Sequence, residues 1–240
     1  MLGMVFPLKD VNPTRITPYI TLGFIIANLV VFFAIQSQQT PNEQQEFLYR
    51  RAAIGCEITT LQPLSAAEII TDTCRSGSEE PLFPEKIPFL SMLTSMFLHG
   101  SAAHVVFNMW FLWIFGNNVE EAFGRIRYIL MYLAGGIGAT MTFVAVNPDS
   151  TIPLVGASGA IAAVLGAYAV LFPGHRVLSL LGWFIVPVPA ALFLGFWFVA
   201  QFGLGGSNVA WEAHAGGFAL GFAMTLIFRK RLLRRVSLGR

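Results

Sequence analysis

Charged residues are scarce in this chain of 240 residues. Only 12% of its residues are Asp, Glu, Lys or Arg, whereas 55% are hydrophobic. A soluble domain is about a quarter charged, so this chain has about half the charge that a water-covered surface needs. The same figures exclude a disordered chain, a coiled coil and a basic nucleic-acid-binding protein. Because Phe and Gly are both abundant, as is typical of packed membrane helices, the composition indicates a polytopic membrane protein.

The apolar residues gather in six stretches, and a transmembrane helix needs about 20 such residues. No cleavable signal peptide is expected, because the first stretch follows Lys9 and Arg15 and has the features of a membrane anchor. The second stretch is short. The apolar residues 88–98 before it either begin the same helix or form a half-inserted loop. The predicted spans are residues 18–35, 103–115, 126–146, 154–172, 180–202 and 209–228.

Basic residues are distributed unevenly between the two sides of these spans. Eleven of the 15 Lys and Arg residues precede the first span, follow the second and fourth, or follow the sixth. The positive-inside rule therefore predicts an all-α bundle of six transmembrane helices with both termini in the cytoplasm. The predicted parts are a cytoplasmic segment 1–17, a membrane domain 18–228 with an extracytoplasmic loop 36–87, and a basic cytoplasmic tail 229–240. We expect a multi-pass protein of a bacterial cytoplasmic (inner) membrane.

Cysteine is as scarce as charge, and both cysteines, Cys56 and Cys74, fall in the outer loop. They are able to pair where the compartment is oxidising, and the alternative is two unrelated thiols. The loop is also rich in proline and too short for a domain with its own core. A disulfide is expected to brace the loop and to matter little for groups carried by the membrane helices.

Lys and Asp are absent from all six predicted spans. An intramembrane aspartyl protease needs two embedded carboxylates, and a Ser-Lys dyad needs an embedded lysine, so both are excluded. No HExxH sequence is present, which excludes a zinc protease of that type. Ion-driven transporters carry buried acids, and these are missing too.

The polar residues that the spans do contain are His104 and Asn108 in the second, Ser158 in the fourth and His214 in the sixth. All three spans run from outside to inside in the predicted topology. Asn108, Ser158 and His214 follow the starts of their spans by four or five residues, which places each about 6–8 Å below the outer end. Three helices therefore carry potentially catalytic groups at one depth.

These residue types suit nucleophilic catalysis. A serine hydroxyl becomes a good nucleophile when a histidine accepts its proton. Ser158 begins a predicted helix, whose free N–H groups would stabilise an oxyanion. Asn108 and His104, one helical turn apart, would add side-chain donors. No acidic residue stands by to orient His214, so the arrangement would be a dyad. Taken singly, each residue also has a structural interpretation as a packing or hydrogen-bonding group.

Small residues predict that the fourth and sixth spans touch. Ser158, Ala162 and Gly166 share one helix face, and Gly217 and Gly221 form a GxxxG pair on the other helix. Such faces let helix backbones approach closely, which would bring His214 to Ser158.

At these residues the chain resembles a known family. The segments HVVFN, GASGA and AHAGG, in this order on alternate spans, are similar to those of the rhomboid intramembrane serine proteases, and the similarity covers about residues 88–228. The resemblance implies a Ser158–His214 dyad and an oxyanion site made by Asn108, His104 and the Ser158 backbone. It also implies membrane-anchored protein substrates in the lipid bilayer, no cofactor and no metal. Some members carry an aromatic residue at the position of Ala162, which stacks on the catalytic histidine.

Two other functions compete with a serine endopeptidase that cleaves substrates in or near their transmembrane segments. One is a catalytically inactive rhomboid-like protein that binds transmembrane helices as a chaperone or trafficking factor. Such proteins usually lose the serine or the histidine, and this chain retains both. The other is a channel or transporter, against which the lack of embedded charge counts.

Overall fold

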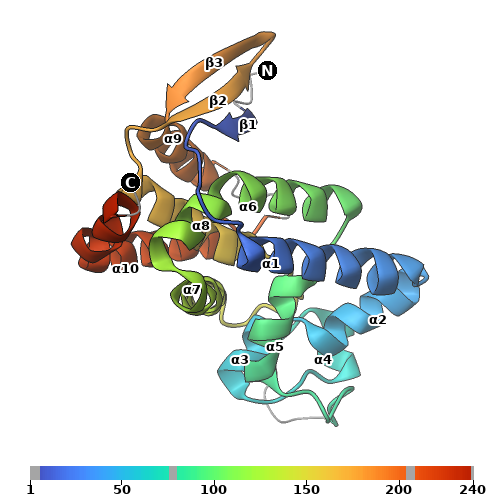
Figure 1. The fold of residues 1–240 in the computed structure, drawn as a ribbon. Helices are drawn as coiled ribbons and strands as arrows, with labels where there is room; N and C mark the ends of the chain where they lie inside the picture. The colour runs from blue at the N-terminus through green and yellow to red at the C-terminus, as the bar shows by residue number, and fades with distance from the viewer. Residues whose placement is uncertain (1–5, 76–79, 204–208, 239–240) are drawn as a thin grey trace.

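The computed structural model describes residues 6–75, 80–203 and 209–238, and most of these residues are helical (Figure 1). Turns of π and 3₁₀ helix, η1 (Val31–Ile35) and η2 (Gln36–Gln38), extend the first helix, and a 3₁₀ turn η3 (Ser95–Phe97) extends α5. The α-helices are α1 (Tyr19–Val30), α2 (Pro41–Arg51), α3 (Gly55–Thr60), α4 (Ala66–Thr71), α5 (Pro88–Thr94), α6 (Ala102–Phe123), α7 (Arg125–Val146), α8 (Ser158–Leu171), α9 (Ala190–Phe202) and α10 (Trp211–Leu238).

Helix α8 lies at the centre of the helical bundle. Twelve of its 14 residues are buried, because its sequence is apolar or small on every side. Helices α6, α7 and α10 pack around it. Ser158 is therefore the first residue of the most enclosed helix in the described chain.

Two described helices are long and apolar enough to cross a membrane alone, Tyr19–Gln38 and Arg125–Val146. A third candidate is the pair Pro88–Phe97 and Ala102–Phe123, which is bent by 81°. The apolar stretch 88–98 thus forms a helix of its own at an angle to α6, rather than the start of the same helix. Helices α8 and α9 are apolar but shorter. Six spans and cytoplasmic termini stay predictions.

Residues 180–189, predicted as the start of the fifth helical span, form part of a β-hairpin, so that boundary is wrong. Strand β2 (Arg176–Leu181) pairs antiparallel with β3 (Phe184–Pro189), and β1 (Phe6–Asp10) completes a sheet in the order β1-β2-β3. Gly182 has a φ of 61°, which a two-residue hairpin loop requires. Pro187 and Pro189 disfavour a helix, so α9 begins only at Ala190. An all-α description misses this sheet.

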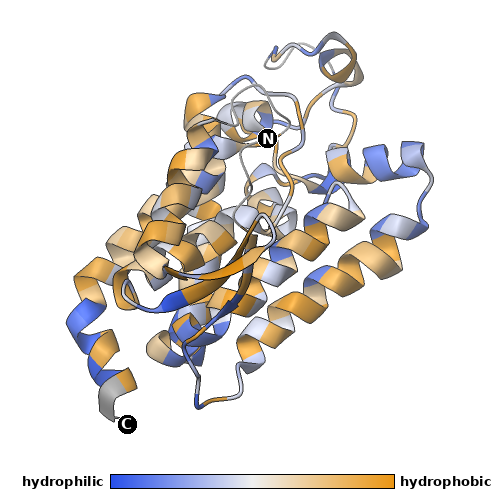
Figure 2. Cartoon of the chain, turned by 90° about the horizontal axis from the view of Figure 1, so that it is seen from above, coloured by the Kyte–Doolittle hydropathy of each residue, from blue (hydrophilic) through white to orange (hydrophobic). Residues whose placement is uncertain are grey.

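Helix α10 continues from the last predicted span into the basic segment after residue 228. Figure 2 shows this change along the helix, from hydrophobic residues to hydrophilic ones near the C-terminus. The residues 229–238 of the predicted tail are therefore helical.

The predicted outer loop 36–87 contains the short helices α2, α3 and α4. A disulfide joins Cys56 in α3 to Cys74, with Cα atoms 5.7 Å apart, so the predicted pairing is confirmed. Beside the disulfide, Ile54 and Leu64 form a small apolar cluster with Cys56. The loop is thus a lobe held by a cross-link and a few apolar contacts.

A buried ion pair also holds the lobe. Lys86 Nζ lies 2.5 Å from Glu57 Oε2, and both side chains are only 2% exposed. The Leu64 N–H donates to the other Glu57 oxygen at 3.0 Å. Burial raises the pKa of Glu57 and lowers the pKa of Lys86. Removing one partner would leave the other charge buried alone, which typically costs 3–5 kcal/mol.

Glu120 ties α6 to the beginning of α1. Its side chain is fully buried, and its Oε2 atom accepts hydrogen bonds from both the backbone N–H and the hydroxyl of Thr21 at 2.8 Å. Its Oε1 atom accepts from the N–H of Ile20 at 3.1 Å. A carboxylate at a helix N-terminus satisfies free N–H groups and interacts favourably with the helix dipole. This contact fixes α1 beside α6.

Candidate active site

Gly156, two residues before Ser158, has a backbone conformation and surroundings that admit no side chain. Gly156 has a φ of +125°, and a Cβ added there would lie 2.9 Å from the His104 ring and 3.4 Å from Ser158 Oγ. The imidazole of His104 and the hydroxyl of Ser158 therefore flank the same point of the chain. Gly156 is needed both for its conformation and for this close approach.

His214 lies in the first turn of α10 and is oriented by a neighbouring helix. Its Nδ1 atom is 2.7 Å from the Oε1 atom of Gln201 on α9. The amide nitrogen of Gln201 donates to the Trp197 carbonyl oxygen at 2.9 Å, so Oε1 is the atom that faces the ring. An amide oxygen only accepts; Nδ1 therefore carries the proton, and Nε2 of neutral His214 is free to act as a base.

Gln201 is the partner of His214 that the sequence analysis missed. It is buried, although it lies near the end of an otherwise apolar helix. That position is the available signal, because a buried amide in a membrane helix needs a hydrogen-bond partner. An aromatic neighbour of His214 also comes from α9: the ring of Trp197 lies 6.1 Å from the imidazole.

Asn108 is buried in α6, four residues after His104. Its side-chain nitrogen has no hydrogen-bond partner among the described residues. An unpaired buried N–H donor is costly. His104 packs edge-to-face against His99, with ring centroids 5.0 Å apart. The backbone of His99 exchanges two hydrogen bonds of 3.0 Å with Gln36, which gives His99 a structural role.

Helices α8 and α10 touch as the small residues predict. A Cβ at Gly217 would overlap the carbonyl oxygen of Gly159, and one at Gly221 would overlap that of Ala163. A Cβ at Gly166 would in turn overlap the Phe218 carbonyl oxygen. The predicted close approach is therefore confirmed.

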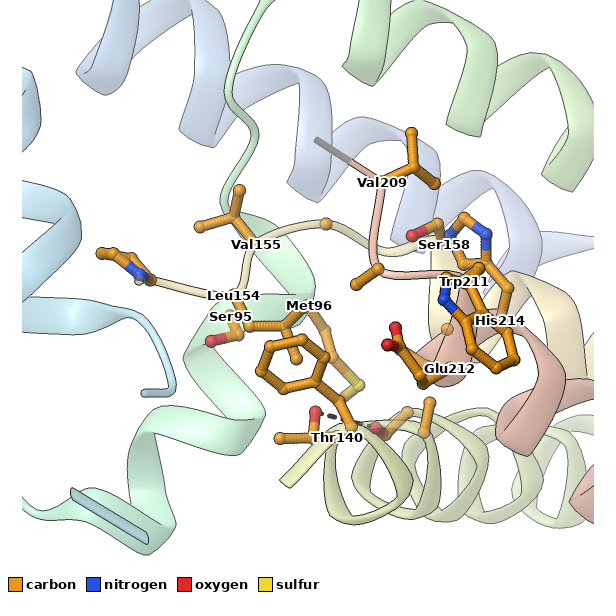
Figure 3. Close-up of a pocket in the computed structure, with 18 of the residues that line it drawn as sticks. Ser95, Met96, Thr140, Leu154, Val155, Ser158, Val209, Trp211, Glu212 and His214 are labelled. Carbon is orange, nitrogen blue, oxygen red and sulfur yellow. Dashed lines mark hydrogen bonds between the residues drawn. The ribbon is translucent and has the colours of Figure 1, made fainter. Parts of the chain in front are cut away.

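Two histidine side chains and one serine side chain share one cavity. Ser158, His104 and His214 line a cavity of about 640 Å³, which Figure 3 shows with Ser158, Trp211 and His214 on one side. Ser95, Leu154 and Val155 lie across the cavity from them. Asn108 is not among the residues that line it. In the described part of the chain, no group of three His, Cys, Asp or Glu residues is arranged to hold a metal ion.

The outer lobe holds the segment that leads into Ser158. The Cys56 N–H donates to the Ser150 carbonyl oxygen at 2.9 Å, and the Leu154 N–H donates to the Ala53 carbonyl oxygen at 2.8 Å. The Ala53 N–H donates to Ser95 Oγ at 2.5 Å. The backbone groups of Ala53 and Cys56 therefore connect the lobe to the cavity wall.

Comparisons with known proteins show the family of this chain. The family model described as the Rhomboid domain matches residues 88–231. "Rhomboid protease GluP" of Bacillus subtilis is 32% identical over 209 residues, which are 82% of this chain and 39% of that protein. "RHOMBOID-like protein 1" of Arabidopsis thaliana is 32% identical over 88% of this chain and 53% of its own length.

Mitochondrial proteins are also similar, including "Presenilin-associated rhomboid-like protein A, mitochondrial" of Danio rerio, at 32% identity over 59% of this chain and 39% of its own. The chain thus spans between about two fifths and about half of the length of these relatives. The matched region contains all four predicted site residues and the apolar helices that carry them. The chain is an integral membrane protein that belongs to the rhomboid family.

Proposed function

We propose that this chain is a serine endopeptidase that cleaves membrane-anchored proteins within or near their transmembrane segments. Ser158 is the nucleophile and His214 is the general base. The observation that carries this proposal is the hydrogen bond between His214 Nδ1 and Gln201. It leaves the Nε2 atom of His214 unprotonated in the cavity that Ser158 also lines.

The reaction follows from these groups. Ser158 Oγ forms a bond to the carbonyl carbon of the substrate while its proton moves to His214 Nε2. The negative charge on the substrate oxygen is stabilised by the N–H groups of Asn108, His104 and the Ser158 backbone. The tetrahedral intermediate then expels the amine, which takes the proton from His214. Water releases the acyl group by the same steps in reverse, and no cofactor or metal is required.

The proposal includes the membrane arrangement. Six spans with both termini in the cytoplasm put the N-terminal ends of α6, α8 and α10 toward the outer leaflet, so substrates are cut near the outer boundary of the membrane. The basic residues at the end of α10 support this orientation through the positive-inside rule. The proposed location is the inner membrane of a bacterium.

A serine-reactive fluorophosphonate probe tests the chemistry directly. Purified protein in liposomes is incubated with the probe and, separately, with a model transmembrane substrate. We expect labelling and cleavage to disappear in Ser158→Ala and His214→Ala, because loss of either group costs many orders of magnitude in rate. Ser37→Ala, at an exposed serine, is the matched control and should behave as wild type.

The alternative function predicts a different result. An inactive helix-binding protein would retain the transmembrane segment without labelling or cleavage in the wild type. That outcome, or normal turnover in Ser158→Ala, would reject the proposed enzyme.

A further inference from the structure

We infer that the β2–β3 hairpin is a lipid-binding element, whose apolar loop and outer strand lie against lipids in the interfacial region of the cytoplasmic leaflet. This inference goes beyond proteolysis. It rests only on the proposed orientation of α6 in the membrane.

The loop of the hairpin exposes three consecutive large apolar side chains. Trp183 is 97% exposed, Phe184 is 75% exposed and Ile185 is 61% exposed. Fully burying such a side chain is worth about 1.5–3 kcal/mol, so leaving all three in water is unfavourable. Figure 1 shows why they are uncovered: β2 and β3 project from the edge of the helical bundle, beyond α9. A contiguous exposed patch of this kind marks an interaction surface.

Contacts of β1 place the sheet beside α6. At one end of the strand, the Trp110 indole N–H donates to the Pro7 carbonyl oxygen at 2.8 Å, and the Phe6 and Trp110 rings stack 6.0 Å apart. At the other end, the Asn118 amide donates to Asp10 at 2.6 Å. The sheet therefore runs along about 12 Å of α6. In the proposed orientation this stretch lies toward the cytoplasmic side.

The neighbouring helices expose apolar side chains in the same way. Trp113 of α6 is 54% exposed, and Leu192 and Phe196 of α9 are 67% and 60% exposed. Strands β2 and β3 contact α9, and β1 contacts α6. The exposed hairpin is thus continuous with helix surfaces that lipid is expected to cover.

The sequence of the hairpin lacks the charge that protects strands in water. Residues 177–189 contain no Asp, Glu, Lys or Arg, whereas water-exposed edge strands usually carry charged side chains, especially lysine. An aromatic residue at the tip suits the membrane interface, where Trp and Tyr are enriched.

The free edge of β3 has few unsatisfied donors. Because Leu181 pairs with Phe184 across the two-residue loop, alternate residues of β3 direct their N–H groups away from β2. These residues are Ile185, Pro187 and Pro189, and proline has no N–H. A single outward N–H in the strand, that of Ile185, remains. Unpaired backbone groups are not tolerated in hydrocarbon, so this group and the outward carbonyls favour the interface, where water and headgroups reach them.

Spin labelling tests this inference without reference to activity. Because both native cysteines form a disulfide, a Cys introduced at position 183 is the only thiol that a nitroxide reagent modifies. Labelled Trp183→Cys is reconstituted in phosphatidylcholine and phosphatidylglycerol vesicles. Its collision rates with oxygen and with water-soluble nickel ethylenediaminediacetate are then measured. Phe184→Cys is the second variant if the first does not fold.

Three control positions calibrate the result. Ile26→Cys, on the exposed face of α1, reports lipid. Glu46→Cys, on the lobe, reports water. Arg176→Cys, exposed at the open end of the same hairpin, is the matched control. Its label should collide with the nickel reagent more often than the label at position 183 does.

We expect the oxygen-to-nickel ratio at position 183 to be several-fold above that at Arg176→Cys and to approach that at Ile26→Cys. A ratio equal to that of Glu46→Cys would overturn the inference, because the loop would then lie in water. Spectral broadening that disappears on dilution with unlabelled protein would overturn it too, because a second copy would then cover the hairpin.

Discussion

The Nδ1 atom of His214 lies 2.7 Å from the Oε1 atom of Gln201, and the two residues belong to neighbouring helices. The described partner of Nδ1 is an amide oxygen and not a carboxylate. A neutral amide holds the same tautomer that a carboxylate would hold, but it adds no negative charge beside the ring. Gln201 is therefore a positioning residue for the proposed base.

Gln201→Leu should slow the reaction without abolishing it. The substitution removes one hydrogen bond to His214, and a loss of 1–2 kcal/mol corresponds to a factor of about 5–30 in rate. The measurement is the rate of fluorophosphonate labelling, with Gln45→Leu, at an exposed position of α2, as control. An unchanged labelling rate in Gln201→Leu would mean that the hydrogen bond does not orient the base.

Asn108→Ala should lower kcat by about 10²–10³ while KM changes little, as expected for the loss of one oxyanion donor. The remaining activity should exceed that of Ser158→Ala, because His104 and the Ser158 N–H remain. Cleavage kinetics with a transmembrane substrate measure this, and Asn42→Ala on the lobe is the control. If Asn108→Ala keeps the wild-type kcat, Asn108 is not an oxyanion donor and has a packing role only.

Gly217→Val and Gly221→Val should each separate α10 from α8, because a larger side chain would overlap the carbonyl oxygens of Gly159 and Ala163. Overpacking of this kind costs about 1–3 kcal/mol, and the displaced His214 should reduce activity as well. Gly195→Val on α9 is the control, because a Cβ there meets no atom within 4 Å. Cleavage and thermal stability are measured together. If both Gly217→Val and Gly221→Val match the control in cleavage and in thermal stability, the close contact of α8 and α10 is not needed for either property.

Loss of the disulfide should affect catalysis, contrary to what the sequence alone suggests. Cys56 and Cys74 are 18 positions apart, and closing such a loop is worth about 3 kcal/mol. Cys56 also bonds through its backbone to Ser150, in the segment before Ser158. Replacing both cysteines by Ser should increase proteolysis of the lobe and reduce substrate cleavage. Faster proteolysis with full cleavage activity would show that the cavity wall holds without the brace.

Asp10 should make stability depend on pH. Burial raises its pKa from 3.8 to about 6, although a hydrogen bond from Tyr168 acts in the opposite direction. Between about pH 4 and pH 6 the folded protein therefore keeps a proton that the unfolded chain has lost.

The stabilisation from Asp10 is thus present below about pH 4 and is lost as pH rises through 6, with an upper limit of about 3 kcal/mol. Thermal unfolding of wild type and Asp10→Asn between pH 4 and 7.5 measures it. The wild type should lose stability relative to Asp10→Asn across this window. A constant difference between the two proteins would show that Asp10 does not titrate there.

The sequence predicts that Ser158 and His214 lie near each other, and the structure places both beside one cavity, whereas the sequence does not predict the sheet. The depth of Ser158 and His214 follows from helix starts and rise per residue, and their helices touch because small residues recur at helical spacing. The sheet could not be predicted from periodicity, since a short apolar run fits a strand or a buried helix. Pro187 and Pro189 are local signs against a helix, and they do not by themselves indicate a strand. The partner of His214 depends on how α9 packs, which sequence spacing does not encode.

The three hydrogen bonds that Glu120 accepts from α1 bear on the order in which the chain is assembled. The N-cap residue of α1, Pro18, makes no side-chain capping hydrogen bond, and α1 is synthesised about 100 residues before its acceptor Glu120. The N–H groups of Ile20 and Thr21 therefore lack this acceptor until residue 120 is made, and the Glu120 side chain accepts no hydrogen bond from any other described residue. Unpaired polar groups are costly in hydrocarbon, and these hydrogen bonds pair the groups of both helices. Both partners of this contact precede Ser158 in the chain, so they are synthesised before the helix that carries Ser158.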